Sequence, residues 1–138
     1  MQSRKEKSGY WLILGPGEEV KSTISAWARK NKVTGAQVWG IGAITGVELA
    51  YYDPHAKKWK AMHYPEKSYE LLSLIGNISE DGLHAHACMS DSGFRVHGGH
   101  LQSAKISVFG EFFVLPTAKL RKVPVAKLGL KGIDLKKQ

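Results

Sequence analysis

One segment of this sequence has the periodicity of an α-helix, and about six segments have the patterns of β-strands. Between Gly17 and Gly35 apolar residues recur every three or four positions, which predicts an amphipathic helix that begins at Gly17. The glutamates at 18 and 19 then fall in its first turn and the basic residues at 29, 30 and 32 in its last, as the helix dipole favours. One principal helix followed by strands predicts an α+β fold.

The expected strands are short apolar runs that end at glycine, proline or other turn residues. They lie at 10–14, 36–52, 57–63, 69–78, 83–90 and 104–115. The run YELLSLIGNI (69–78) is nearly all apolar, as a central strand covered on both faces would be. In the last strand, Ile106, Val108, Phe112 and Val114 share one face. These patterns predict a single α+β domain with a mainly antiparallel sheet of about six or seven strands.

Two glycines, Gly40 and Gly42, fall on one face of the expected strand at 36–52. A glycine inside a strand marks a bulge or the close approach of another chain segment. We expect one of these two features at this point of the sheet.

The excess positive charge lies at the two ends of the chain. The net charge is +8, of which residues 1–9 contribute +2 and residues 119–138 contribute +6, so that residues 10–118 are neutral. We therefore divide the chain into a basic N-terminal tail (1–9), a domain (10–118) and a basic C-terminal tail (119–138). Such tails contact nucleic-acid phosphates, or they are only solvated. The candidates for nucleic-acid contact are Lys119, Arg121, Lys122, Lys127, Lys131, Lys136 and Lys137.

The cysteine content and the first residues both favour the cytoplasm. Cys88 is the single cysteine and has no partner for an intrachain disulfide, which favours a reducing compartment. The start MQSRKEKSGYW has no apolar core of a secretion signal, and no apolar run is long enough to cross a bilayer. We expect a cytoplasmic protein that does not interact with membranes.

Four of the six histidines lie in the stretch HAHACMSDSGFRVHGGHLQ. His84 and His86 are two positions apart on an expected strand, so their imidazoles point to the same side. A turn at 91–93 and a return through Gly98-Gly99, where glycine permits unusual backbone conformations, would bring His100 against this pair. Three imidazoles suit zinc or another late divalent transition metal and leave one position open. The alternative is a histidine-rich surface strand that binds no metal.

Six further residues are candidates to line or support such a site. Cys88 shares a strand face with His84 and His86. It would be either a soft metal ligand or a small buried thiol. We interpret His97 as a surface residue or as one that supports a ligand. Glu70 and Glu111 each interrupt an apolar strand. Each would either form an ion pair or act as a general base beside metal-bound water. The full set of candidates is Glu70, Cys88, His97, Gly98, Gly99 and Glu111.

The order of these motifs resembles the plant and prokaryote conserved (PPC) domain. The resemblance starts with Pro-Gly-Glu-Glu before the helix and continues through GIGAITGVELAYYD, YELLSLIGNI and HAHACMSDSGFRVHGGHL to the strand with Glu111. It covers residues 10–117, and its most specific part is His-x-His followed by Gly-Gly-His-Leu. The resemblance implies a mainly antiparallel domain that assembles as a homotrimer, in which His84, His86 and His100 bind a metal, commonly zinc.

The resemblance also suggests DNA as a binding partner. In plants the domain follows an AT-hook, an Arg-Gly-Arg-Pro segment that reads the minor groove, and prokaryotic members are called DNA-binding by extension. This sequence contains no such segment. DNA contact would then be non-specific, through the basic tails of three copies acting together. We favour a metal-binding oligomeric protein that contacts DNA in this way. A small-substrate metalloenzyme and a purely structural trimer are the alternatives.

Overall fold

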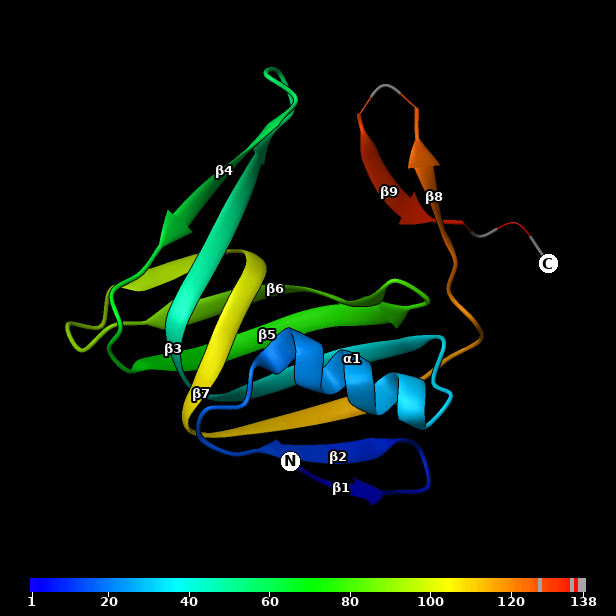
Figure 1. Ribbon diagram of the computed structural model, residues 1–138, viewed down its shortest axis with the longest axis horizontal. Helices are drawn as coiled ribbons and strands as arrows, with labels where there is room; N and C mark the ends of the chain where they lie inside the picture. Colours follow the sequence, from blue (N-terminus) through cyan, green and yellow to red (C-terminus); the bar gives the residue numbers. More distant parts are fainter. Residues whose placement is uncertain (127, 135, 137–138) are drawn as a thin grey trace.

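The computed structural model describes residues 1–126, 128–134 and 136. This part contains one helix, α1 (Val20–Lys30), and nine strands (Figure 1). The strands are β1 (Gln2–Lys5), β2 (Tyr10–Leu14), β3 (Ala36–Asp53), β4 (Lys58–His63), β5 (Tyr69–Ser79), β6 (Gly82–Ser90), β7 (Val96–Pro116), β8 (Lys122–Val125) and β9 (Leu130–Ile133). Helix α1, the one helix of the described residues, is not long and apolar enough to cross a membrane.

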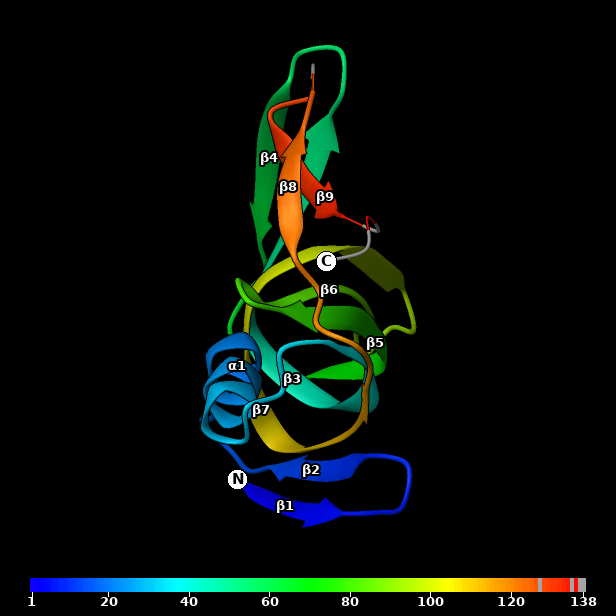
Figure 2. The ribbon, with the colours of Figure 1, turned by 90° about the vertical axis from the view of Figure 1, so that its right-hand side faces the viewer.

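Seven strands form one antiparallel sheet in the order β1-β2-β7-β6-β5-β3-β4. The two long strands β3 and β7 also pair with each other, so the sheet curls back on itself. Figure 2 shows this curvature around a common interior, with α1 against one side. The arrangement confirms the predicted α+β fold with a mainly antiparallel sheet.

The helix buries the predicted apolar stripe, but it begins later than expected. Val20, Ile24, Trp27 and Ala28 are buried in the core. The first helical residue is Val20 rather than Gly17, because Glu19 caps the helix. Its carboxylate accepts hydrogen bonds from the backbone N–H groups of residue 21, at 3.1 Å, and residue 22, at 2.6 Å. The negative charge therefore lies at the N-cap instead of in the first turn.

Strand β7 is longer than predicted and contains an irregularity. The register between β3 and β7 shifts around residues 107–109, where β7 carries extra residues relative to its partner. This bulge turns Val108 to the exposed side, whereas Ile106, Phe112 and Val114 are buried. The expectation that all four share one face is wrong for Val108, because simple alternation does not continue through a bulge.

The prediction for Gly40 and Gly42 is confirmed. The register between β3 and β5 shifts between these two glycines. A Cβ atom at Gly40 would lie 2.3 Å from Cδ1 of Phe112 and 2.6 Å from the carbonyl oxygen of Glu111. Glycine is required at this position because β7 approaches β3 too closely for any side chain.

Strand β5 is covered on one face only. Leu71, Leu74 and Ile78 are buried in the core, whereas Leu72 and Ile75 are exposed, the latter to 65%. The expectation of cover on both faces is therefore wrong for a single copy of the chain. The apolar outer face needs another explanation.

Both basic ends contain strands where tails were expected. Strand β1 lies at the edge of the main sheet beside β2. Strands β8 and β9 form a hairpin that projects from the same end of the molecule as the β3–β4 arm (Figures 1 and 2). The expected candidates Lys127 and Lys137 lie outside the described residues.

Candidate metal centre

Strands β6 and β7 bring the three predicted histidines together. His84 and His86 lie on one face of β6, and His100 on β7 is the direct cross-strand partner of His86. One ligand atom from each of the three lies within 4.8 Å of the other two. Their ring centroids are 5.0 to 5.6 Å apart. The three side chains are close enough together to hold one metal ion.

The glycines before His100 matter because they have no side chain, and not because of an unusual backbone conformation. Neither Gly98 nor Gly99 has a positive φ. A Cβ atom at Gly99 would lie 3.0 Å from the carbonyl oxygen of Ala50, and one at Gly98 would lie 3.2 Å from that of Ala87. The reason given from the sequence is therefore wrong. The glycines allow β7 to fit closely between β6 and β3, which places His100 opposite His86.

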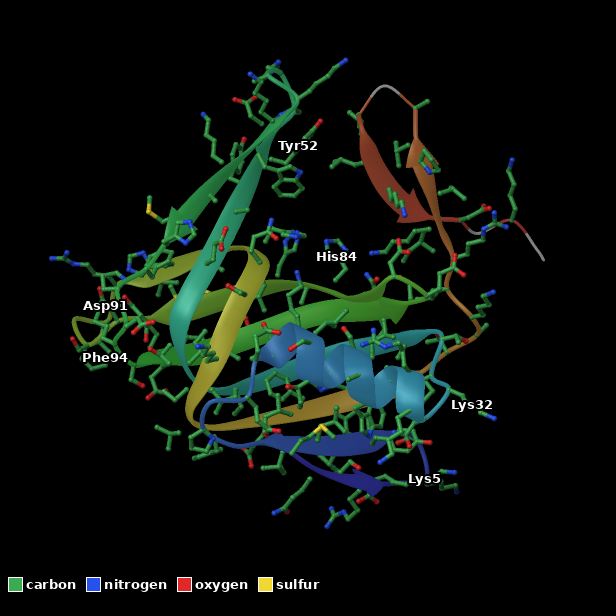
Figure 3. The ribbon with its side chains drawn as sticks, in the orientation of Figure 1. Lys5, Lys32, Tyr52, His84, Asp91 and Phe94 are labelled. Carbon is green, nitrogen blue, oxygen red and sulfur yellow. The ribbon has the colours of Figure 1, made fainter. Side chains whose placement is uncertain are left out.

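The three histidines lie in a pocket of about 470 Å³. Figure 3 shows His84 in the space between the β3–β4 arm, which carries Tyr52, and the β8–β9 hairpin. The Tyr52 hydroxyl donates a hydrogen bond to the Leu128 carbonyl and so ties the arm to the hairpin. Besides the histidines, the pocket is lined by Lys21, Tyr52, Trp59, Leu83, Lys122, Leu130 and Lys131.

The pocket keeps two of the histidines in the form that binds metals. Burial lowers the pKa of His84, and the nearby Lys122, His86 and Lys21 lower it further. Burial and the charges of His84 and Lys21 lower the pKa of His100 to about 4. Both side chains are therefore neutral at pH 7, as a metal ligand must be.

Lysines make the pocket electropositive. Lys21 reaches across from α1, and its Nζ donates a hydrogen bond to the Leu101 carbonyl at 3.0 Å. Burial lowers the pKa of Lys122, Asp81 raises it, and Lys131 and Lys21 lower it. Within the described part of the chain, no aspartate or glutamate lines this pocket.

Asn77 on β5 provides a hydrogen-bond acceptor beside the cluster. It is the direct cross-strand partner of His84, so the two side chains are neighbours on one face. Its Oδ1 atom is buried and has no hydrogen-bond partner among the described residues. Histidines that bind metals usually donate their second ring N–H to such an oxygen. The residues present therefore fit a metal held by the three imidazoles.

The remaining candidates lie outside this cluster. Cys88 shares the face of His84 and His86 but is not part of the three-histidine group. His97 lies on the other face of β7, 3.5 Å from the Asp91 carboxylate and packed against a tyrosine. Glu70 and Glu111 are exposed, line other pockets, and form no ion pair among the described residues.

Sequence reasoning missed several residues of the pocket. The sequence patterns do not point to Lys21, Tyr52 or Trp59, and they indicate Lys122 and Lys131 only as nucleic-acid contacts. Lys21 lies at the start of α1, and Trp59 packs against His100 with ring centroids 4.8 Å apart and the ring planes tilted by 50°. These residues come from separate segments, so no local spacing links them to the histidines.

Acid is expected to destabilise the metal-free protein through His100. The unfolded chain binds a proton at this side chain with a pKa near 6.5, whereas the folded protein does so only at about 4. The stabilisation is complete above pH 6.5 and is lost as the pH falls towards 4. We expect a loss on the order of 1 kcal/mol, since solvent screens this partly exposed group.

Urea unfolding between pH 7 and 4.5 measures this effect, with His100→Gln as the comparison. The variant lacks the titrating group, so its free energy of unfolding should depend less on pH. Equal pH dependence in the two proteins would contradict the role of His100.

Comparison with known proteins identifies the family. The Plants and Prokaryotes Conserved (PCC) domain matches residues 1–117. A plant- and prokaryote-conserved protein of Pyrococcus horikoshii is 28% identical, with a TM-score of 0.82 over 98% of this chain and 96% of that one. A "putative dna binding protein" of Bacteroides thetaiotaomicron is 25% identical, with a TM-score of 0.90 over 96% of each chain.

A curated relative shares a shorter region. The bifunctional protein GlmU of Synechococcus sp. (strain JA-3-3Ab) is 28% identical over 94 residues, which is 67% of this chain. The match spans only 14% of that protein's length. The match to the PCC domain over most of the chain confirms the resemblance drawn from the motifs. The chain belongs to the Plants and Prokaryotes Conserved (PCC) domain family.

Proposed function

We propose that this protein is a metal-binding module in which His84, His86 and His100 hold zinc or another late divalent transition metal. The observation that carries the proposal is the convergence of three imidazoles, with ligand atoms within 4.8 Å of one another. Three protein ligands leave a fourth coordination position, which would face the pocket. A bound ion would offer this position as a Lewis acid to water or to an anionic ligand.

Cobalt(II) tests the proposal, because it replaces zinc and absorbs visible light in sites of low coordination number. Titration of the metal-free protein should give an absorption band that saturates at one ion per chain and disappears when zinc is added. A titration without this band would contradict a three-imidazole site.

The pocket favours ligand binding over hydrolysis. A zinc hydrolase needs a general base near the metal-bound water, and carboxylates usually take this role. Glu70 and Glu111, the candidates from the sequence, line other pockets. The described residues of the histidine pocket supply lysines instead. We therefore propose a binding function without catalysis at this centre.

We further propose that copies of the chain associate through an outer apolar face, as the homotrimer that the family resemblance implies. Monomeric proteins rarely expose a large continuous apolar surface. Here exposed apolar side chains from β2, β3, β5 and β7 lie on one side of the sheet, and Trp39 and Ile75 are direct cross-strand partners. The outer apolar face consists of Trp11, Ile13, Trp39, Ile41, Leu72, Ile75, Val108 and Phe109.

Ile75→Glu should dissociate the assembly into smaller species, because it would bury a charge without a partner in the interface. Analytical ultracentrifugation measures the change. The dissociation constant of the assembly should rise by a factor of about a hundred or more, which corresponds to a loss of roughly 3 kcal/mol in the free energy of association. Tyr51→Glu is the control, since Tyr51 is equally exposed but lies outside this face. A monomeric wild-type protein, or an unchanged variant, would contradict the proposed interface.

Non-specific contact with DNA is a second candidate function. It is favoured by the positive charge in residues 119–138 and by the description of the Bacteroides relative. Arg121 is exposed, whereas Lys119 lies 3.6 Å from the Glu80 carboxylate and Lys122 is half-buried beside the histidines. Any contact with DNA would thus involve only some of the basic residues in 119–138.

Binding to a short DNA duplex should therefore be salt-sensitive but modest. If about four phosphates are neutralised, the affinity should fall about a hundredfold between about 50 and 200 mM salt. The double variant Lys119→Gln/Arg121→Gln should reduce both the affinity and the salt slope, and Arg29→Gln/Lys30→Gln serves as the control with equal charge. Fluorescence anisotropy checks this, and the absence of binding at low salt would exclude the second function.

A further inference from the structure

We propose that the histidine pocket binds a small organic anion, whose carboxylate or phosphate takes the open position of the metal and pairs with the surrounding lysines. This inference rests on the proposed metal site and identifies the class of ligand that the site would accept.

Charge is the first argument. Lys21, Lys122 and Lys131 line the pocket, and no carboxylate lines it in the described part of the chain. Asp81 lies outside the lining and accepts a hydrogen bond from Lys131 at 3.2 Å. Imidazoles bind a metal in the neutral form and leave the charge of a divalent ion uncompensated. A metal together with these lysines would therefore require an anion.

The lysines are placed to meet that anion. Lys21 uses one of its three donors on the Leu101 carbonyl, at 3.0 Å, which holds the ammonium group next to His100 and leaves two donors. Lys122 is half-buried, so its ammonium group loses part of its hydration and gains from pairing with an oxyanion. Charges in such a partly enclosed site act more strongly than at an open surface.

The walls of the pocket indicate an organic rather than an inorganic anion. Trp59 lies between Tyr52 and His100, with ring centroids 5.2 and 4.8 Å away. Leu83 and Leu130 add aliphatic surface. The volume of about 470 Å³ is within the range of small-molecule sites and far larger than an inorganic phosphate needs. An aromatic or short hydrocarbon group on the anion would fill this space.

The β8–β9 hairpin would determine which anion is selected. It supplies Lys122, Leu130 and Lys131 to the pocket, and it lies beyond the residues that match the family domain. The hydrogen bond from Tyr52 to Leu128 holds it beside the arm. The ligand would thus bind between the histidines of the family domain and this additional segment.

Isothermal titration calorimetry on the zinc-loaded chain of residues 1–138 tests the inference. Phenyl phosphate and benzoate are the two probes and distinguish a phosphate from a carboxylate ligand, while benzyl alcohol is the neutral control. We expect one molecule of at least one anion to bind per chain, at least tenfold more weakly when zinc is removed. Benzyl alcohol should not bind measurably.

Two variants separate the pocket from general charge effects. Lys122→Gln and Lys21→Gln should each weaken the binding of the anion at least tenfold. Lys30→Gln removes the same charge from the far end of α1 and should leave the affinity unchanged. Circular dichroism identifies any variant that does not fold, and the second lysine variant then provides the test.

The zinc content of each sample distinguishes the two possible failures. If zinc binds but neither anion does, or if both pocket variants bind like the wild type, the inference is overturned and the metal site stands. If the protein binds neither zinc nor cobalt(II), both proposals are overturned.

Discussion

His100→Ala should lower the affinity for zinc by more than a factor of about a hundred, because the loss of a mere supporting partner of a ligand already costs 10- to 100-fold. His100 is the contribution of β7 to the cluster, and the two remaining histidines both lie on β6. A pair of imidazoles on one strand cannot enclose a cation from two sides. Competition with a chromophoric chelator measures the affinity.

The matched control is His63→Ala. His63 lies on β4, is exposed, and is 3.6 Å from the Glu48 carboxylate, outside the three-histidine cluster. This variant should bind zinc like the wild type. Equal affinities for the two variants would show that zinc binds elsewhere, provided that both keep the circular dichroism spectrum of the wild type.

Phe112→Ala should lower the free energy of unfolding by about 3–5 kcal/mol, the usual cost of deleting a fully buried aromatic ring. The Phe112 side chain is fully buried, and its backbone lies between Leu12 of β2 and Gly40 of β3. Gly40 has no side chain that could move into the resulting cavity. Domains of this size have only about 5–15 kcal/mol of stability in total, so the variant should be severely destabilised.

Phe94→Ala makes the same chemical change at the surface. Phe94 is 88% exposed in the turn that follows β6 (Figure 3), so its loss should alter stability by no more than about 0.5 kcal/mol. Chemical denaturation with urea compares the two variants. A loss below about 1 kcal/mol in Phe112→Ala would contradict the described packing of β7 against β3.

The regular parts of the fold could be predicted from the sequence because they depend on local patterns. The strand at 10–14 has the predicted bounds, and the apolar stripe of α1 is buried as expected. The spacing of His84 and His86 predicts that the two side chains share a face, since side chains alternate along a strand. The position of His100 beside them could be predicted from a turn and a return strand alone.

The remaining features depend on contacts between distant segments. The bulge that exposes Val108 follows from the pairing of β7 with β3, and strand β1 forms only because β2 lies beside it. The lysines of the pocket come from α1 and from β8–β9, about a hundred residues apart in the sequence. No periodicity in a sequence window can connect such positions.

Strand β5 illustrates a different limit of sequence patterns. Its apolar residues lie on both faces, and such a pattern does not identify what, if anything, covers each face. The core covers Leu74, whereas Ile75 remains exposed in one chain. The proposed association of copies through the outer apolar face would account for this side of β5.

Elemental analysis of protein purified without an affinity tag tests the metal site most directly. The account predicts about one zinc, or one other late divalent transition metal, per chain. After removal by a chelator, the same amount should bind again when zinc is added. A protein that holds no metal as purified and takes up none from added zinc would contradict the central claim.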